Sequence, residues 1–211
     1  MLTVRPPGKV RLSMPSWVSM KEGIRFLESR TEWIRSAIAK YSEDHPAEVI
    51  EMPYSTRNHH LELNPAEIAK VKLSVRNGII SVSYPLDRDF RAKEIQDVVK
   101  KGIEEAWRAE AKEYLPIRVA QLAREHGFRF GKVTIRNTVS KWGSCSVHND
   151  ISLSLHLMRL PDHLIDYVLL HELCHTVHKN HGPGFHQLLD AHTGGRHKAL
   201  HKELRKYTTR W

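Results

Sequence analysis

The chain has 211 residues, of which 40% are hydrophobic and 27% are charged, a mixture that is usual for globular domains and excludes wholesale disorder. This length can bury a core without disulfides, and two cysteines are too few for a disulfide framework. No apolar run approaches the roughly 18 residues that a membrane span needs, and the first residues lack the apolar region of a secretory signal. We therefore expect a cytoplasmic chain with reduced thiols and no membrane association.

Two counts are unusual. Lysine and arginine together number 33 against 24 acidic residues, a net charge of +9. A basic balance can serve a polyanionic partner such as nucleic acid or a nucleotide, but these charges are spread along the chain, which favours a solvated basic surface. Eight of the 15 histidines lie between His171 and His201, and neutral imidazole is the commonest metal ligand.

The amino-terminal region reads as strand, turn and helix. Residues 10–14 alternate between apolar and polar, which predicts a half-buried strand closed by Pro15. Apolar residues at helical spacing over residues 24–41 predict a helix, with Ser19 as its N-cap. The polar stretch 42–64 is typical of a connection rather than of core.

A hairpin and helices follow. Residues 71–85 predict two short strands around the Asn-Gly pair at 77–78, the strongest short hairpin signal. Helical spacing continues over residues 95–107, and we expect this helix to stop at Pro116. A separate helix is predicted over residues 117–126.

Short strands and a turn are predicted after residue 131. Residues 133–135 predict a strand, residues 141–146 (KWGSCS) a compact turn, and residues 151–155 a strand with one polar face. Pro161 stands where a helix would begin.

The last helices carry most of the histidines. The apolar face of residues 164–170 runs into HELCH, and Gly182-Pro183-Gly184 is expected to end that helix. Short helices are predicted over residues 185–191 and 197–207. We therefore expect an α+β fold in two regions: a strand-containing amino-terminal region, residues 1–130, and a catalytic region, residues 131–211.

The motif His171-Glu172-Leu173-Cys174-His175 is the sharpest chemical signal. Histidines four residues apart on a helix lie on one face, so both imidazoles can reach one ion. Glu172, on the flank of that face, can accept a proton from water without ligating the metal. Zinc suits such a set, because three protein ligands leave a fourth position for water.

Several residues could supply the third ligand. His178 lies about 10 Å along a straight helix from His171, too far for one ion to bind both. His181 precedes the Gly-Pro-Gly break, where the chain can turn back, so we favour it and place His186 second. The remaining options are Asp190, His192 and Glu203.

The segment HELCHTVHKNHGPGF resembles the YgjP-like metal-dependent hydrolases, which belong with the SprT-like and WLM zinc metallopeptidases. KWGSCS and the strand after it resemble a second block of that family. The resemblance is clear over residues 135–189 and weaker in the amino-terminal region. It implies a zincin-like domain with His171, His175 and His181 as zinc ligands and Glu172 as the catalytic residue.

The chain departs from this family at two positions. Gly182 stands where the family often has serine, and His186 replaces the usual tryptophan after Phe185. A fourth imidazole near the ion could alter its coordination or line the pocket. By analogy with zincins, the strand 151–155 could be an edge to which an extended peptide adds.

Three functions compete on this basis. The first is a zinc metallopeptidase that uses zinc-activated water with Glu172 as general base. The second keeps the metal but hydrolyses a nucleotide phosphoanhydride, which the positive charge favours. The third is a nucleic-acid-associated protease module. A cysteine nucleophile at Cys145 is disfavoured, because a small packed thiol explains that residue better, and Cys174 is expected in the core.

Overall fold

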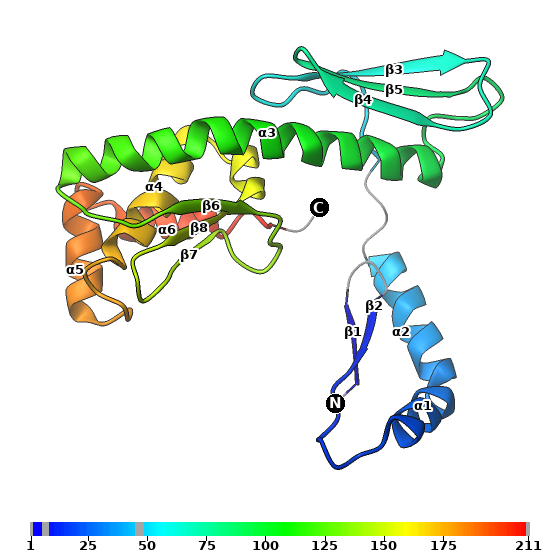
Figure 1. Ribbon diagram of the computed structural model, residues 1–211, viewed down its shortest axis with the longest axis horizontal. Helices are drawn as coiled ribbons and strands as arrows, with labels where there is room; N and C mark the ends of the chain where they lie inside the picture. Colours follow the sequence, from blue (N-terminus) through cyan, green and yellow to red (C-terminus); the bar gives the residue numbers. More distant parts are fainter. Residues whose placement is uncertain (1, 6–8, 45–48, 210–211) are drawn as a thin grey trace. The chain divides into compact units, whose positions relative to one another are not determined.

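The computed structural model describes residues 2–5, 9–44 and 49–209 (Figure 1). Contacts between Cα atoms divide the chain into two units, residues 1–49 and 50–211. The expected boundary near residue 130 falls inside the second unit, and the separation of a catalytic region from residue 131 remains a prediction.

Among its described residues, the first unit contains an antiparallel pair of strands and two helices. Ser19 caps the first helix, as predicted, and it also forms a capping box with Glu22. The single helix expected over residues 24–41 is wrong in one respect: Arg30, at φ −110° and ψ 12°, separates two helices. The elements are β1 (Leu2–Arg5), β2 (Lys9–Leu12), α1 (Met20–Ser29) and α2 (Thr31–Asp44).

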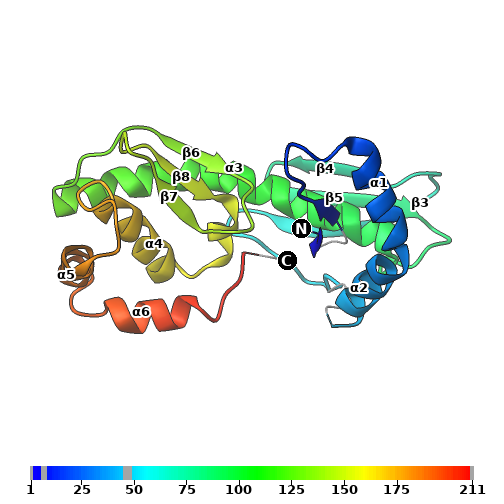
Figure 2. The ribbon, with the colours of Figure 1, turned by 90° about the horizontal axis from the view of Figure 1, so that it is seen from below.

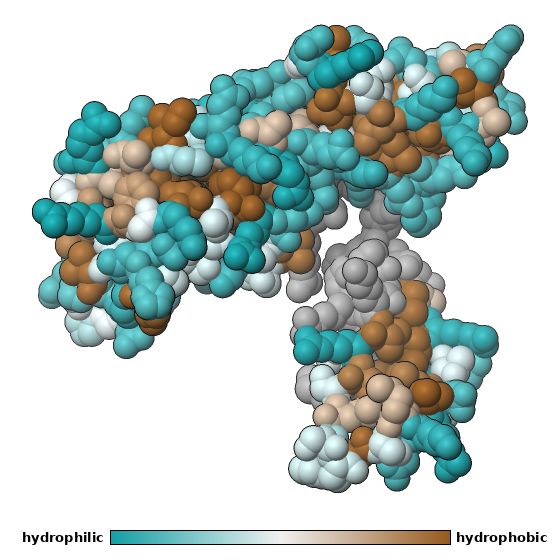
Figure 3. Space-filling model, viewed as in Figure 1, coloured by the Kyte–Doolittle hydropathy of each residue, from teal (hydrophilic) through white to brown (hydrophobic). Residues whose placement is uncertain are grey.

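Apolar side chains remain on the surface of this first unit (Figure 3). Its most exposed large apolar residues are Trp17, Met20, Ile24, Phe26 and Trp33. Isolated exposed apolar residues are normal on protein surfaces, and nothing in the described residues shows what covers this group.

The second unit opens with a three-stranded sheet that packs on one long helix (Figure 1). Its strands are β3 (His60–Ala66), β4 (Lys72–Arg76) and β5 (Ile79–Pro85), in the order β3-β5-β4. The hairpin at Asn77-Gly78 is confirmed, with both residues at positive φ (51° and 75°). The prediction of a connection over residues 42–64 is wrong at its end, because β3 begins there and Leu61 is buried.

Helix α3 (Lys93–His126) runs for 34 residues without a break at Pro116, which corrects the prediction of two helices. Proline removes one backbone hydrogen bond from a helix. Here Leu115 and Val119, on either side of it, are fully buried, and this packing offsets the loss. The uninterrupted helix contacts both sheets of the unit and joins them.

The second sheet lies beside the carboxyl-terminal half of α3 (Figures 1 and 2). Its strands are β6 (Val133–Arg136), β7 (Gly143–Cys145) and β8 (Ile151–Ser154), in the order β6-β8-β7. The segment KWGSCS, predicted as a compact turn, therefore contains strand β7. Because β8 is central, the expectation of a free edge at residues 151–155 is wrong, and the open edge nearest to α4 belongs to β7.

The remaining elements are helical: η1 (Leu155–Arg159, a 3₁₀ helix), α4 (Asp162–Cys174), α5 (Pro183–His192) and α6 (His197–Leu204). Helix α4 begins after Pro161 as predicted, but it ends at Cys174, well before the Gly-Pro-Gly segment. Gly182 and Pro183 instead start α5. None of the helices in the described ranges is long and apolar enough to cross a bilayer.

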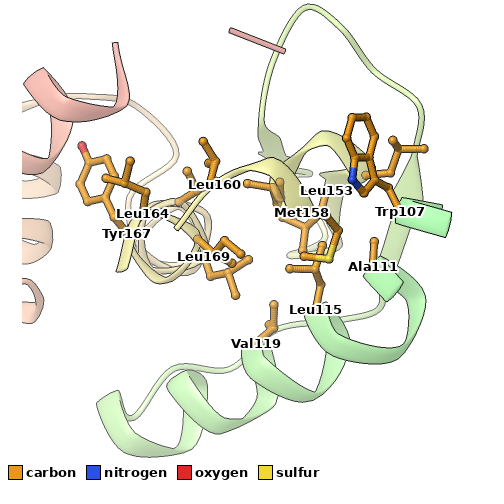
Figure 4. Close-up of a cluster of buried hydrophobic side chains, with 14 of the residues drawn as sticks. Trp107, Ala111, Leu115, Val119, Leu153, Met158, Leu160, Leu164, Tyr167 and Leu169 are labelled. Atoms are coloured by element: carbon orange, nitrogen blue, oxygen red, sulfur yellow. The ribbon is translucent and has the colours of Figure 1, made fainter. Parts of the chain in front are cut away.

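Part of the core of the second unit lies between α3, β8, η1 and α4 (Figure 4), and the core continues between α3 and strands β3 and β5. An ion pair from Arg118 to Asp166, with both N–H···O contacts at 2.7 Å, also joins α3 to α4. Helix α4 is thus held rigidly. The side chains that fill this core include Trp107, Ala111, Leu115, Val119, Leu153, Met158, Leu160, Leu164 and Leu169.

Candidate metal centre

Three histidines meet where α4 ends. His171 lies in its last turn, His175 is its C-cap, and His181 lies between α4 and α5. Nε2 of His181 is 3.1 Å from Nε2 of His175 and 3.1 Å from Nε2 of His171. One ring nitrogen from each residue lies within 4.8 Å of the others.

This donor set fits a transition metal. At metal–nitrogen distances of roughly 2.0–2.1 Å, two ligands of a tetrahedral site are about 3.3 Å apart, close to the spacing observed here. Nδ1 of His175 lies 2.9 Å from the carbonyl oxygen of His178. An N–H donated there leaves the lone pair of Nε2 facing the other two rings, as in metal sites whose histidines are oriented by a second hydrogen bond.

The surroundings of His171 and His175 lower the pKa values of their rings. Burial, with repulsion from His175 and His181, lowers the pKa of His171 to about 3. Burial also lowers the pKa of His175. Both shifts favour the neutral ring, which is the form that a metal ligand requires.

Phe185 supplies an apolar wall to the cluster. Its ring is buried and lies 4.5–4.9 Å, between centroids, from the rings of His171, His175 and His181. It stacks on His175 with an interplanar angle of 26°. Packing of this kind restricts the orientations that the ligand rings can adopt.

The side chain of Glu172, which follows His171 in the chain, lies against Gly143 of β7. Glu172 is 5% exposed, and its buried Oε2 has no hydrogen-bond partner among the described residues. Burial raises its pKa to about 7, against a smaller lowering by Lys141. A buried acceptor without a partner is costly in a stable fold, and such costs are concentrated at functional sites.

The other candidate ligands lie outside this cluster. Nδ1 of His186 lies 3.3 Å from Nε2 of His197, and Glu203 bonds to His163. His192 lies against His126, and Asp190 accepts the backbone N–H of His197. The ring of His178 is exposed, so this residue contributes its carbonyl group.

The sequence did not indicate the supporting roles of two residues near this cluster. Gly143 of β7 packs against Glu172, and the glycine in KWGSCS was the available signal. Lys179 donates from Nζ to the carbonyl oxygen of Ser146 at 2.8 Å and to Oδ1 of Asn149. It therefore ties the segment between His175 and His181 to the β7–β8 turn, a contact that no local pattern indicates.

Three clustered histidines at the end of a helix, within a mixed helix-and-sheet fold, are the arrangement expected of a metal-dependent hydrolase. The family model described as "YgjP-like, metallopeptidase domain" matches residues 1–207. The chain thus belongs to the YgjP-like family, as the motif resemblance indicated, and it is a metal-dependent peptidase.

Two solved structures are also similar. One is the metallopeptidase zymogen jannalysin of Methanocaldococcus jannaschii, with 20% identity over 42% of this chain and 91% of that one, at a TM-score of 0.38. The other is the metallopeptidase zymogen abylysin of Pyrococcus abyssi, with 21% identity over 42% and 90% of the two chains, also at 0.38. A comparison with curated proteins returned no match.

Proposed function

We propose that the protein is a zinc peptidase in which His171, His175 and His181 hold the ion and Glu172 is the general base. One observation carries the proposal: three imidazoles lie within reach of one ion, and Glu172, the residue that follows the first of them in the chain, is buried with an Oε2 that lacks a hydrogen-bond partner among the described residues. A catalytic zinc site usually has three protein ligands, three histidines being one such set, and its fourth position stays open.

Glu172 is proposed to carry out both proton transfers of peptide hydrolysis. When bound, zinc supplies Lewis-acid chemistry, which lowers the pKa of water and polarises a carbonyl group. Glu172 accepts the proton of the water that adds to the peptide carbonyl, and then delivers a proton to the leaving amide nitrogen as the C–N bond breaks. Without the ion, burial raises the pKa of Glu172 to about 7, toward the operating pH at which a general base works best.

Strand β7 is the proposed binding edge for the substrate. It pairs only with β8 in the described sheet, and Gly143 brings it against Glu172. An extended peptide that adds to this edge would form main-chain hydrogen bonds beside the catalytic carboxyl group. Recognition through the backbone predicts broad tolerance of side chains.

A substrate panel tests the proposal. Protein reconstituted with zinc should cleave denatured casein or a peptide library and release new amino termini. A strong chelator should abolish this activity, and added zinc should restore it. Glu172→Gln, with the same zinc content, serves as the matched inactive control.

The same panel includes nucleoside triphosphates, alone and with nucleic acid. The comparisons give no support to nucleotide or nucleic-acid partners, and no observation at the site favours them. Hydrolysis of triphosphates by the wild type but not by Glu172→Gln, without any peptide cleavage, would contradict the proposed function.

A further inference from the structure

A second group of histidines lies on α5 and α6. Nδ1 of His186 and Nε2 of His197 are 3.3 Å apart, with ring centroids separated by 5.3 Å. The ring of His201 lies 6.2 Å from that of His197. His197 and His201 are four residues apart on α6, the same spacing that places His171 and His175 on one face of a helix.

Two contacts position His197, one at its ring and one at its backbone. The hydroxyl group of buried Tyr167 lies 3.1 Å from Nδ1 of His197, and the two rings are stacked. Asp190 accepts the backbone N–H of His197 through Oδ1 at 3.2 Å. If Nδ1–H donates to the tyrosine oxygen, the lone pair of Nε2 faces His186. This is the arrangement by which metal-binding histidines are oriented.

From this geometry we infer that His186 and His197, joined by His201 after its exposed ring rotates, form a second site for a divalent transition metal beside the three-histidine cluster, with no ligand in common. The spacing of 3.3 Å equals the separation of about 3.3 Å expected for two nitrogen ligands of a tetrahedral ion. The donors are all imidazoles, which suit zinc, copper and nickel rather than calcium or magnesium.

The second site is weaker than the first. Its third ligand, His201, is exposed and must rotate to join the other two, whereas His181 already lies 3.1 Å from both of its partners. The rings of His181 and His186 are 6.4 Å apart, so each group can be removed without deleting a ligand of the other. This inference does not depend on the proposed peptidase mechanism.

Metal titration of tag-free, chelator-treated protein tests the inference. Calorimetry with zinc should resolve two binding events in the wild type, one tight and one weak. His186→Gln and His197→Gln should each lose the weak event and keep the tight one. His60→Gln, which changes an exposed histidine on β3, is the matched control and should keep both.

Two further variants separate this inference from the proposed function. His171→Ala should lose the tight event and keep the weak one. Tyr167→Phe keeps the aromatic ring but removes the acceptor of Nδ1–H, and it should weaken the weak event by about tenfold.

Copper gives a direct readout of the ligands. With the tight site filled by zinc, a substoichiometric amount of Cu²⁺, frozen before it exchanges into the tight site, should show imidazole nitrogen couplings in its electron paramagnetic resonance spectrum. These couplings should disappear in His186→Gln, whose exposed side chain makes misfolding no concern. A single zinc event in the wild type, or a weak event that survives in both His186→Gln and His197→Gln, would overturn the inference.

Discussion

Gly143 lies directly against Glu172: a Cβ atom at position 143 would approach Cγ and Oε1 of Glu172 to 2.7 Å. Only glycine therefore leaves the carboxyl group where it is. We expect Gly143→Ala to push this buried side chain aside and lower peptide turnover by at least about tenfold, because small misplacements of catalytic groups are costly. Zinc content should not change, since no histidine of the cluster is displaced.

Gly182→Ala is the matched control for this change. Position 182 has φ −79° and offers open space to a Cβ atom. Steady-state kinetics and metal analysis of both variants provide the measurement. Full activity in Gly143→Ala would show that the position of Glu172 does not matter for turnover.

His181→Ala should remove most of the bound zinc, because only two of the three clustered nitrogens would remain. His178→Ala should retain it, since the backbone carbonyl group of His178, not its exposed ring, orients His175. Metal content after dialysis against a weak chelator distinguishes the two. Equal zinc retention in both variants would remove His181 from the ligand set.

Lys179→Met should lower zinc affinity by about tenfold, the lower end of the effect of losing a contact that supports metal ligands. The variant keeps a long apolar side chain but loses the bonds from Nζ to Ser146 and Asn149. Lys179→Arg should recover part of the affinity, and Lys112→Met, on the exposed face of α3, should leave it unchanged. Competition against a chromogenic chelator measures all three; wild-type affinity in Lys179→Met would contradict the role of this tether.

Local chemistry explains which features the sequence could predict. The Asn77-Gly78 turn, the Ser19 cap and the spacing of His171 and His175 depend on residues close in the chain, and all three are found as expected. The choice of His181 over His186 as the third metal ligand does not depend on local chemistry. It depends on how the chain turns after α4, and the sequence could only rank the two.

The errors arise where distant contacts override local signals. Pro116 is a strong helix breaker. Helix α3 nevertheless continues past it, because α3 packs against α4 and η1. Strand β7 has only three residues and begins with glycine, so it exists through its pairing with β8 and its contact with α4. No periodic pattern could predict it.

His156 should make stability depend on pH. Burial lowers its pKa to about 4, whereas an unfolded histidine titrates near 6.5. The unfolded state therefore binds the proton more readily. The associated stability is fully present above about pH 6.5 and is lost as the pH falls toward 4, by up to about 3 kcal/mol.

His156→Gln tests this dependence. Glutamine cannot titrate but can still donate to Asn137, the partner of Nε2 in the wild type at 2.9 Å. Urea unfolding of chelator-treated protein between pH 4 and 7 should show a shallower loss of stability in the variant. The difference between the two proteins isolates His156 from the other histidines; parallel curves would show that its protonation is not linked to folding.

The most direct test of the proposed mechanism compares metal content and turnover in Glu172→Gln. Glutamine keeps the size and hydrogen bonding of the side chain but cannot accept the proton. We expect zinc to remain at the wild-type level, because the carboxyl group is not a ligand, while peptide turnover falls by at least about 10²–10⁴-fold. Loss of zinc together with activity would make Glu172 a ligand or a structural support, and full activity with zinc in place would place the general base elsewhere.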